Sequence, residues 1–209
     1  MLSSIIMTAD IALSAVSNPD IAKFISNNEI DFSRLRSRKT VLYVMVRQQD
    51  LSYFGFILNL FYSQLFRHLL SERNELDLPV YLLLDEFGHL TIPDFAIYAT
   101  TARKYRVAFW IFLHDLSQLE SRYGHIEART ILGGLGTDIY MSGLDTKTAE
   151  DICKRIGRRR RTDKKERSLY GEMNLMNPDE IIHMDDDEVL LLHSNKYPLR
   201  MKVTPYYKR

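Results

Sequence analysis

The sequence predicts an α/β fold in which a mostly parallel sheet is covered by helices on both faces. Three observations support this prediction. Apolar stretches of strand length alternate with longer segments of helical character, which is the element order of a parallel sheet. The strand-like stretches are apolar almost throughout, as expected for strands buried on both faces. One of them, in the run VYLLLDEFGHL at residues 80–90, ends on two adjacent acids.

The composition is that of an ordinary globular protein. Its 209 residues suffice for one good-sized domain, or for one domain with an appendage. Apolar residues make up 45% and charged residues 26% of the chain, and the net charge of +1 excludes a global field that would attract nucleic acid or membrane. The single cysteine, Cys153, excludes an internal disulfide.

No membrane segment is predicted. The N-terminal stretch lacks the basic region of a secretory signal, and Asp10 interrupts its apolar run. Residues 51–70 approach the length of a membrane span, but polar side chains interrupt them. We therefore interpret this segment as a buried helix.

The first half of the chain is expected to alternate between helix and strand. Residues 1–26 have helical character, and Pro19 is expected to begin a second helix with Asn18 or Ser17 as its cap. The elements that follow are expected to be a strand at 40–46, a helix at 51–72, a strand at 80–85 and a helix at 93–104.

The second half continues this alternation before its character changes. We expect a strand at 107–113, short helices at 115–124 and 125–134, a strand at 138–143, and a helix from its N-cap Asp145 to its stop at Gly157. A charged linker follows. Residues 188–207 then predict two strands around a turn at Ser194–Pro198.

The two adjacent acids point to a nucleotide site. In an open parallel sheet, ligands gather outside the carboxyl ends of the strands, and an apolar strand that finishes on Asp85 and Glu86 has the form of a Walker B motif. In that motif the first acid holds Mg²⁺, usually through water, and the second orients the water that attacks the γ-phosphate. The alternative is that both acids cap the next helix or begin a loop.

The phosphate-binding half of such a site is missing from the 209 residues. They contain no G-x-x-x-x-G-K-[ST] sequence. The run GGLGTD at 133–138 is better explained as a turn between a helix and a strand. The residues alone therefore predict half of a nucleotide site.

The order of several motifs resembles a known family. The motifs are LLLDEFG, ATTARKYRVAFWIFLHDLSQLESRYG, GTDIYMSGLDTKTAEDICKRIG and NPDEIIHMDDDEVLLLHSNKYPLRMKVTPYY. From about residue 20 onward the chain resembles the C-terminal half of type IV secretion coupling proteins of the TraG/TraD type. The resemblance implies a RecA-like half-domain of a P-loop NTPase with a C-terminal β-hairpin. It also implies ATP and Mg²⁺ as cofactors of the parent protein.

The same resemblance implies a domain organisation. Residues 1–26 would end an inserted all-α domain, residues 27–157 would form the RecA-like core with the Walker B acids, and residues 158–209 would be a basic linker and a strand pair. A P-loop and a membrane anchor would lie upstream of this sequence.

The resemblance further implies a cellular setting. Proteins of this family are described as hexameric ATPases at the cytoplasmic face of the bacterial inner membrane. The expected assembly of the parent protein is therefore a homo-hexamer. The expected partners are secretion channel components or a relaxosome protein, since this region of the family is named for recognising the relaxosome protein TraM.

The site residues are carried over by position. Asp85 matches the acid that holds Mg²⁺, and Glu86 matches the acid that activates water. Arg103 falls where the family has an arginine that reaches the neighbouring subunit's nucleotide, with Arg106 as a competing candidate. His114 departs from the family, which has a glutamine that senses the γ-phosphate there, and its charge would depend on pH.

The charged segments and tail aromatics have plainer interpretations. The basic run at 157–167 could contact DNA phosphates, but we favour a solvated loop because such runs are common on globular proteins. The acidic run at 185–188 is expected to form a turn before a strand. Tyr206 and Tyr207 are expected to pack on the sheet.

The sequence thus predicts the C-terminal part of a motor that delivers plasmid DNA or effector protein to a secretion channel by ATP hydrolysis. The chain alone is not expected to hydrolyse ATP, because it lacks a P-loop. Two alternatives remain open. One is a non-catalytic module that recognises a relaxosome or effector partner, and the other is a truncated, non-functional gene product.

Overall fold

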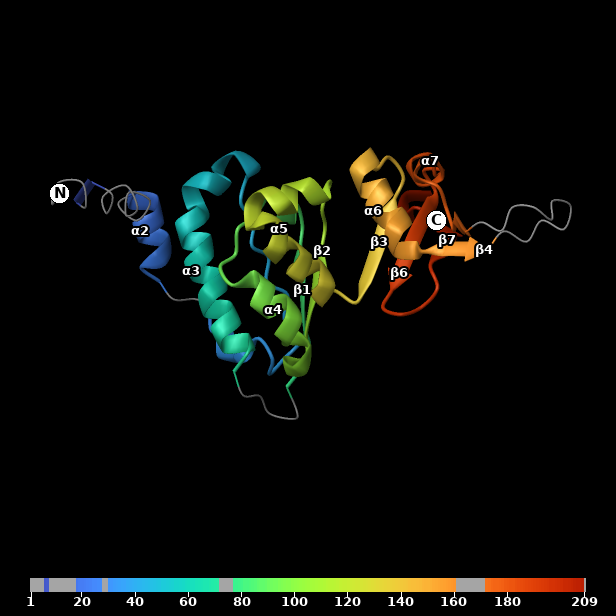
Figure 1. Cartoon of the computed structure of the whole chain (residues 1–209). Helices are drawn as coiled ribbons and strands as arrows, with labels where there is room; N and C mark the ends of the chain where they lie inside the picture. The colour runs from blue at the N-terminus through green and yellow to red at the C-terminus, as the bar shows by residue number, and fades with distance from the viewer. Residues whose placement is uncertain (1–5, 8–17, 28–29, 72–76, 161–171, 209) are drawn as a thin grey trace, which may run out of the picture. The chain divides into compact units, whose positions relative to one another are not determined.

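The chain forms two compact units, which are described separately. A computed structural model describes residues 6–7, 18–27, 30–71, 77–160 and 172–208. The first unit is Met1–Gly134 and the second is Leu135–Arg209. Figure 1 shows the elements of each unit in chain order.

The first unit is built from helices that pack on one face of a pair of parallel strands (Figure 1). Its main elements are α2 (Pro19–Ile25), α3 (Leu51–Leu69), β1 (Val80–Leu84), α4 (Phe95–Thr101), β2 (Val107–Ile111) and α5 (Leu116–Gly134). Short 3-10 helices accompany them at η1 (Phe32–Arg34), η2 (Gln48–Asp50), η3 (Phe87–His89) and η4 (Ala102–Tyr105). β1 pairs with β2 in parallel, from Val80 opposite Val107 to Leu84 opposite Ile111.

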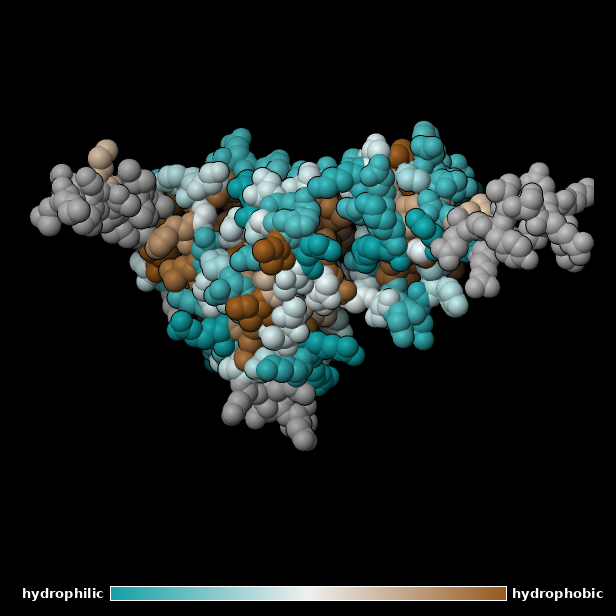
Figure 2. Space-filling model, viewed as in Figure 1, coloured by the Kyte–Doolittle hydropathy of each residue, from teal (hydrophilic) through white to brown (hydrophobic). Residues whose placement is uncertain are grey.

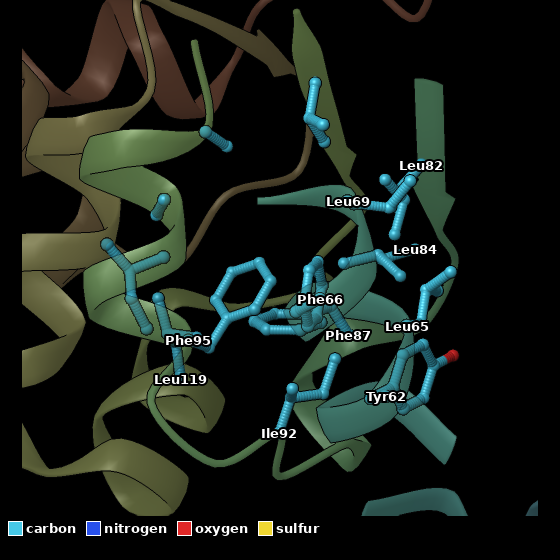
Figure 3. Packing of buried hydrophobic residues seen from close by; sticks show 14 of the residues in the cluster. Tyr62, Leu65, Phe66, Leu69, Leu82, Leu84, Phe87, Ile92, Phe95 and Leu119 are labelled. Atoms are coloured by element: carbon cyan, nitrogen blue, oxygen red, sulfur yellow. The ribbon is translucent and has the colours of Figure 1, made fainter. Parts of the chain in front are cut away.

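Aromatic side chains form the centre of the first core. Phe66 of α3, Phe87 of η3 and Phe95 of α4 are almost completely buried (Figure 3). The ring centroids of Phe87 and Phe95 are 4.6 Å apart, and those of Phe66 and Phe95 are 6.2 Å apart. Aromatic pairs at these distances stabilise a core beyond their area burial. The cluster fixes α3, α4 and the chain after β1 to one another.

α3 enters this core through one helical stripe. Its buried residues are Tyr62, Leu65, Phe66 and Leu69, which follow the spacing of a single helix face. Its first half is apolar on the outer face as well, where Tyr53, Phe56 and Leu60 are exposed. Figure 2 shows apolar patches at the surface of this unit.

The second unit is an antiparallel sheet with helices. Its elements are β3 (Thr137–Met141), α6 (Thr146–Ile156), β4 (Arg158–Arg160), β5 (Glu172–Asn174), α7 (Pro178–Ile182), β6 (Glu188–His193), β7 (Leu199–Lys202) and the 3-10 helix η5 (Tyr206–Lys208). The strands β3, β6 and β7 lie in that order, and every pairing among them is antiparallel. A second core joins this sheet to α6 through buried residues such as Tyr140, Ile152 and Leu190.

Local signals set the ends of several elements where we expected them. Asn18 caps α2 by accepting a hydrogen bond from the Ile21 N–H at 3.4 Å. Asp145 caps α6 by accepting one from the Thr148 N–H at 3.0 Å. Hydrogen bonds from the Thr148 side chain and from its N–H lower the pKa of the Asp145 carboxyl. Gly157 ends α6 with φ +88°.

Two further predictions of elements are confirmed. The two short helices expected at 115–134 are the two arms of α5, which meet at Gly124 with the non-helical angles φ +76° and ψ +160°. At Gly124, glycine permits the positive φ without the steric cost that other residues meet.

The C-terminal hairpin is formed by β6 and β7 around the turn at 194–198.

The prediction of a mostly parallel sheet is wrong. Only β1 and β2 pair in parallel among the described residues, and β3 pairs with β6 in antiparallel register. An apolar run shows that a strand is buried but carries no information about the direction of its partner. Strand β6 of the C-terminal hairpin pairs with β3. The sequence pattern of β3 could not reveal which strand would be its neighbour.

Two more expectations about the first unit are corrected. Residues 40–46 form no strand, and Val41, Tyr43 and Met45 in this segment are exposed. The helices of this unit cover only one face of the strand pair, because Leu82 and Leu84 are buried in the core whereas Leu83 and its partner Trp110 are exposed. The predicted domain boundaries at 26 and 157 stay predictions.

None of the helices within the described ranges is both long and apolar enough to cross a bilayer. α3 is long, but polar side chains such as Asn59 and Arg67 interrupt it. This agrees with the expectation for residues 51–70.

Candidate functional site

The two acids directly follow the carboxyl end of β1. Asp85 is exposed and its Oδ1 accepts a hydrogen bond from the Glu86 N–H at 3.1 Å. Glu86 has a left-handed backbone, with φ +46° and ψ +42°. A non-glycine residue in this region costs on the order of 1 kcal/mol or more. Such a conformation persists only where the surrounding structure holds it.

Backbone hydrogen bonds hold the chain on both sides of Glu86. The Phe112 N–H donates to the Leu84 carbonyl at 3.1 Å, and the Phe87 N–H donates to the Phe112 carbonyl at 3.0 Å. Pairing with the chain after β2 therefore continues past the end of β1. The turn Asp85–Glu86 is fixed to the second strand as well as to its own.

His114 lies at the same end of the strand pair as the two acids. Its Nε2 is 4.0 Å from Oε1 of Glu86, and both side chains are partly open to solvent. The parallel register brings the chain after β1 beside the chain after β2. The structure thus brings Asp85, Glu86 and His114 together, as expected for residues that follow neighbouring parallel strands.

Arg103 lies at the opposite end of the same strands. It belongs to η4, which comes just before β2, and its side chain is exposed. Each strand spans five residues, so at about 3.3 Å per residue the two ends are about 16 Å apart. Arg103 therefore does not join the acids within one copy of the chain.

Arg106 has a structural position. Its Nη1 donates to the Asp77 carbonyl at 3.2 Å, and its own carbonyl accepts from the Val80 N–H at 3.0 Å. It also has a left-handed backbone, with φ +55°. These contacts fix the start of both strands, which favours Arg103 over Arg106 as the arginine available to another molecule.

A groove opens beside the two acids. It has a volume of about 450 Å³ and lies within the first unit. Asp85 and Glu86 line it together with residues 44–48 and side chains of α3 such as Leu58 and Tyr62. Most of the lining residues are apolar, and a few are polar or charged, which is the usual composition of a small-molecule site.

The sequence interpretation missed the segment at 44–48. Arg47 and Gln48 line the groove, and Nε2 of Gln48 is 3.2 Å from Nε2 of His89. We expected an apolar strand to run through residue 46, and nothing in the sequence placed this segment beside the acids. Only the tertiary fold brings residues 44–48 next to β1.

Asp85 and Glu86 could supply only part of the coordination shell of a Mg²⁺ ion. Mg²⁺ is usually held by one or two carboxylates together with water and substrate phosphates. No cluster of three or more metal-binding side chains occurs among the residues that the structure describes. Asp85 can hold Mg²⁺ through water, provided that other ligands come from a bound phosphate and from water.

The charged segments of the second unit have contacts of their own within that unit. Residues 161–167 of the basic run fall outside the described residues, while Arg158–Arg160 pair with β5. The first three residues of the acidic run, Asp185–Asp187, precede β6, and its last residue, Glu188, begins β6. Nη2 of Arg200 is 2.6 Å from Oε2 of Glu188. This contact lowers the pKa of the Glu188 carboxyl.

The expected packing of the tail tyrosines is wrong. Tyr206 and Tyr207 are exposed, and their rings contact each other edge to face at 5.5 Å. They follow β7 on the short helix η5, so they are not part of the sheet.

Comparison with protein families decides the affiliation of the chain. The family model described as "Type IV secretory system Conjugative DNA transfer" matches residues 1–209. The chain belongs to this family.

Two curated members show how distant the relatives are. The VirD4 protein of Rhizobium radiobacter is 26% identical over 214 residues, and the VirD4 protein of Agrobacterium fabrum is 24% identical over 217 residues. Both alignments include 95% of this chain but only 31% and 32% of the relatives. The chain thus spans about a third of the length of the curated relatives that it matches.

Solved structures of a conjugative coupling protein share the fold. The trigonal form of TrwB in complex with sulphate matches 97% of this chain and 49% of its own, with a TM-score of 0.81 and 19% identity. TrwB in complex with ADP and Mg²⁺ matches 76% of this chain and 38% of its own, with a TM-score of 0.64 and 21% identity. The chain therefore has a mixed α/β fold that corresponds to part of TrwB.

Proposed function

We propose that the chain is the Walker B part of a RecA-like motor in a type IV secretion coupling protein. The parent protein would deliver plasmid DNA or effector protein to the secretion channel by ATP hydrolysis. Family membership supports this proposal, as does the ADP and Mg²⁺ bound by the structural relative TrwB. The phosphate-binding loop would come from a part of the parent protein outside these 209 residues.

One observation carries the proposal. Asp85, Glu86 and His114 gather at the carboxyl end of the parallel strands β1 and β2, and both acids line the same groove. Ligands of open α/β sheets bind at this end. The turn that carries both acids is also held by hydrogen bonds on either side, which fixes the acids beside the groove.

Each residue has a proposed role. Mg²⁺ would neutralise charge on the phosphates, and Asp85 would hold it through water. Glu86 would orient the attacking water as its general base, and His114, 4.0 Å from Glu86, would lie near the γ-phosphate. Arg103 would act on the nucleotide of a neighbouring copy, since it lies at the far end of the strands from its own acids.

The proposed setting follows the family. The parent protein would assemble as a homo-hexamer at the cytoplasmic face of the inner membrane and would meet relaxosome or channel proteins there. A head-to-tail interface, in which one surface meets a different surface of the next copy, closes into such a ring. The separation of Arg103 from Asp85 along the strands is compatible with that geometry.

Steady-state ATP hydrolysis by the full-length protein tests this proposal. Glu86→Gln keeps the size of the side chain but removes the base, so we expect kcat to fall at least a hundredfold with little change in KM. The matched control is Glu127→Gln on the exposed surface of α5, which should leave both constants unchanged. Equal rates for Glu86→Gln and wild type would contradict the proposal and would favour a module that only binds partners.

A further inference from the structure

We propose that the first arm of α5 positions the catalytic turn of the proposed ATPase. The residues are Gln118, Leu119 and Tyr123, in the run SQLESRY, and the turn is Glu86–Gly88. The inference rests on the proposed function, because it assigns these residues a role in placing Glu86. They would be positioning residues, since Gln118 and Tyr123 contact the turn and Leu119 packs in the same core.

The ring of Phe87 links Glu86 to α5. Phe87 follows Glu86 directly, is fully buried, and stacks on Tyr123 with ring centroids 5.6 Å apart and planes 16° apart. Leu119, one helical turn before Tyr123, is also fully buried in the same core. The side chain of Phe87 is therefore fixed by α5, while its N–H is fixed by the Phe112 carbonyl.

Gly88 brings the turn into close contact with Gln118. A Cβ at Gly88 would lie 2.5 Å from Oε1 and 2.9 Å from Cβ of Gln118. The amide end of Gln118 could move away, but its Cβ is attached directly to the helix backbone. The turn can approach α5 this closely only because residue 88 has no side chain.

The Tyr123 hydroxyl holds the far end of the same segment. It accepts a hydrogen bond from the Ile92 N–H at 2.9 Å. Burial raises the pKa of Tyr123 to about 12, so its hydroxyl stays neutral at physiological pH. Residues 87–92 are thus fixed to α5 at both ends.

These contacts explain why Glu86 keeps its left-handed backbone. Residue 84 is hydrogen-bonded to the chain after β2, and residue 87 is hydrogen-bonded to the same segment and stacked on α5, so Glu86 has little freedom between them. A catalytic carboxylate must be held close to its productive geometry by side chains whose own positions are locked. The run SQLESRY supplies this support from one helical arm that ends at Gly124.

A purely structural role for α5 makes a different prediction. If these side chains only fill the core, their loss should lower stability without a specific effect on the step that uses Glu86. Tyr123→Phe separates the two cases because it removes the hydrogen bond to Ile92 and keeps the ring that stacks on Phe87. Tyr98→Phe is the matched control, since the Tyr98 ring contacts Phe66 at 4.4 Å in the same core.

The experiment measures kcat and KM for ATP in the full-length protein, well below the midpoint of thermal unfolding. We expect Tyr123→Phe to lower kcat about fivefold to tenfold while KM stays within twofold. Gly88→Ala should lower kcat by tenfold or more, because it displaces the turn from Gln118. Tyr98→Phe should leave kcat within twofold of wild type.

A double-mutant cycle with Glu86→Gln gives the decisive comparison. If Tyr123 acts through Glu86, Tyr123→Phe should cause no further loss in the residual rate of Glu86→Gln. The proposal is overturned if Tyr123→Phe and Gly88→Ala both keep wild-type kcat, or if the losses multiply in the double variant. If Tyr123→Phe fails to fold, Gly88→Ala takes its place in the cycle. A wild-type protein without ATP hydrolysis would instead overturn the proposed function itself.

Discussion

Glu86 combines an unfavourable backbone with a proposed catalytic role. Its φ of +46° lies in a region that side chains other than those of asparagine and aspartate seldom adopt. The flanking residues are held by hydrogen bonds to the chain after β2. Strain of this kind is concentrated at active sites, where the surrounding structure offsets its cost. The conformation of Glu86 is compatible with the proposed role but does not distinguish it from a loop residue, since Asp94, Arg106 and Ser194 also have left-handed backbones.

The candidate site residues are visible in the sequence and stay a prediction, whereas the contacts that support them could not be predicted from it. An apolar run that ends on Asp85 and Glu86 is visible in the sequence, and parallel pairing places His114 nearby. The contact between Gly88 and Gln118 joins segments thirty residues apart in the numbering, and no local pattern specifies it. The same is true of Arg47 and Gln48 beside the groove.

Arg103 gives a prediction that depends on assembly. Full-length Arg103→Ala and Asp85→Asn should each hydrolyse ATP at least tenfold more slowly than wild type. Mixing the two inactive variants should restore part of the activity, because some interfaces then join an intact Arg103 to an intact Asp85. The measurement is ATP turnover as a function of mixing ratio. Restoration would not occur if both residues served the same copy.

Arg106→Ala is the control for this mixing experiment. Its side chain is bound to the Asp77 carbonyl, so its loss should lower the stability of the strand pair. The control mixes Arg106→Ala with Asp85→Asn. If this mixture regained as much ATP turnover as the mixture of Arg103→Ala with Asp85→Asn, the assignment of Arg103 would be contradicted.

At the scale of elements, strong local signals were reliable and pairing was not. The cap at Asp145, the kink at Gly124 and the C-terminal hairpin follow from the residues that form them. Residues 40–46 have the composition of a buried strand, yet their side chains are largely exposed and the segment has no partner strand among the described residues. Strand formation needs a neighbour, and composition alone does not supply one.

The packing of α4 against α5 gives a prediction at this scale. A Cβ at Gly134 would lie 2.8 Å from the oxygen and 2.9 Å from the carbon of the Ala99 carbonyl, whereas a Cβ at Gly133 would meet nothing within 4 Å. Gly134→Ala should therefore destabilise the chain by about 1–3 kcal/mol. Gly133→Ala should be neutral or stabilising by up to about 1 kcal/mol. Urea unfolding of the two neighbouring variants checks this contrast, and equal midpoints would contradict it.

At the scale of the whole molecule, each unit has an apolar sheet face that its own helices leave open. In the first unit this face carries Leu83 and Trp110, and in the second it carries Ile139, Met141 and Met201. Parallel strands are normally covered on both faces, and exposed apolar surface of this extent usually marks an interaction site. The expectation of helices on both faces of the sheet is therefore wrong for the described residues.

The length of the relatives is relevant to this open surface. The chain corresponds to about a third of the curated relatives and to between 38% and 49% of the TrwB chains. We expect the rest of the parent protein to cover the open face of β1 and β2. The acids at the end of β1 would then face ligands supplied by that part, as the proposed half-site requires.

The most direct test of the central claim is the Mg²⁺ dependence of nucleotide binding by the full-length protein. Titration with a fluorescent ADP analogue, with and without Mg²⁺, would measure how much the metal raises affinity in wild type, Asp85→Asn and Glu86→Gln. We predict that Asp85→Asn reduces the gain from Mg²⁺ at least tenfold and leaves metal-free binding within twofold of wild type, while Glu86→Gln changes neither. A gain from Mg²⁺ that was the same in Asp85→Asn as in wild type would contradict the account.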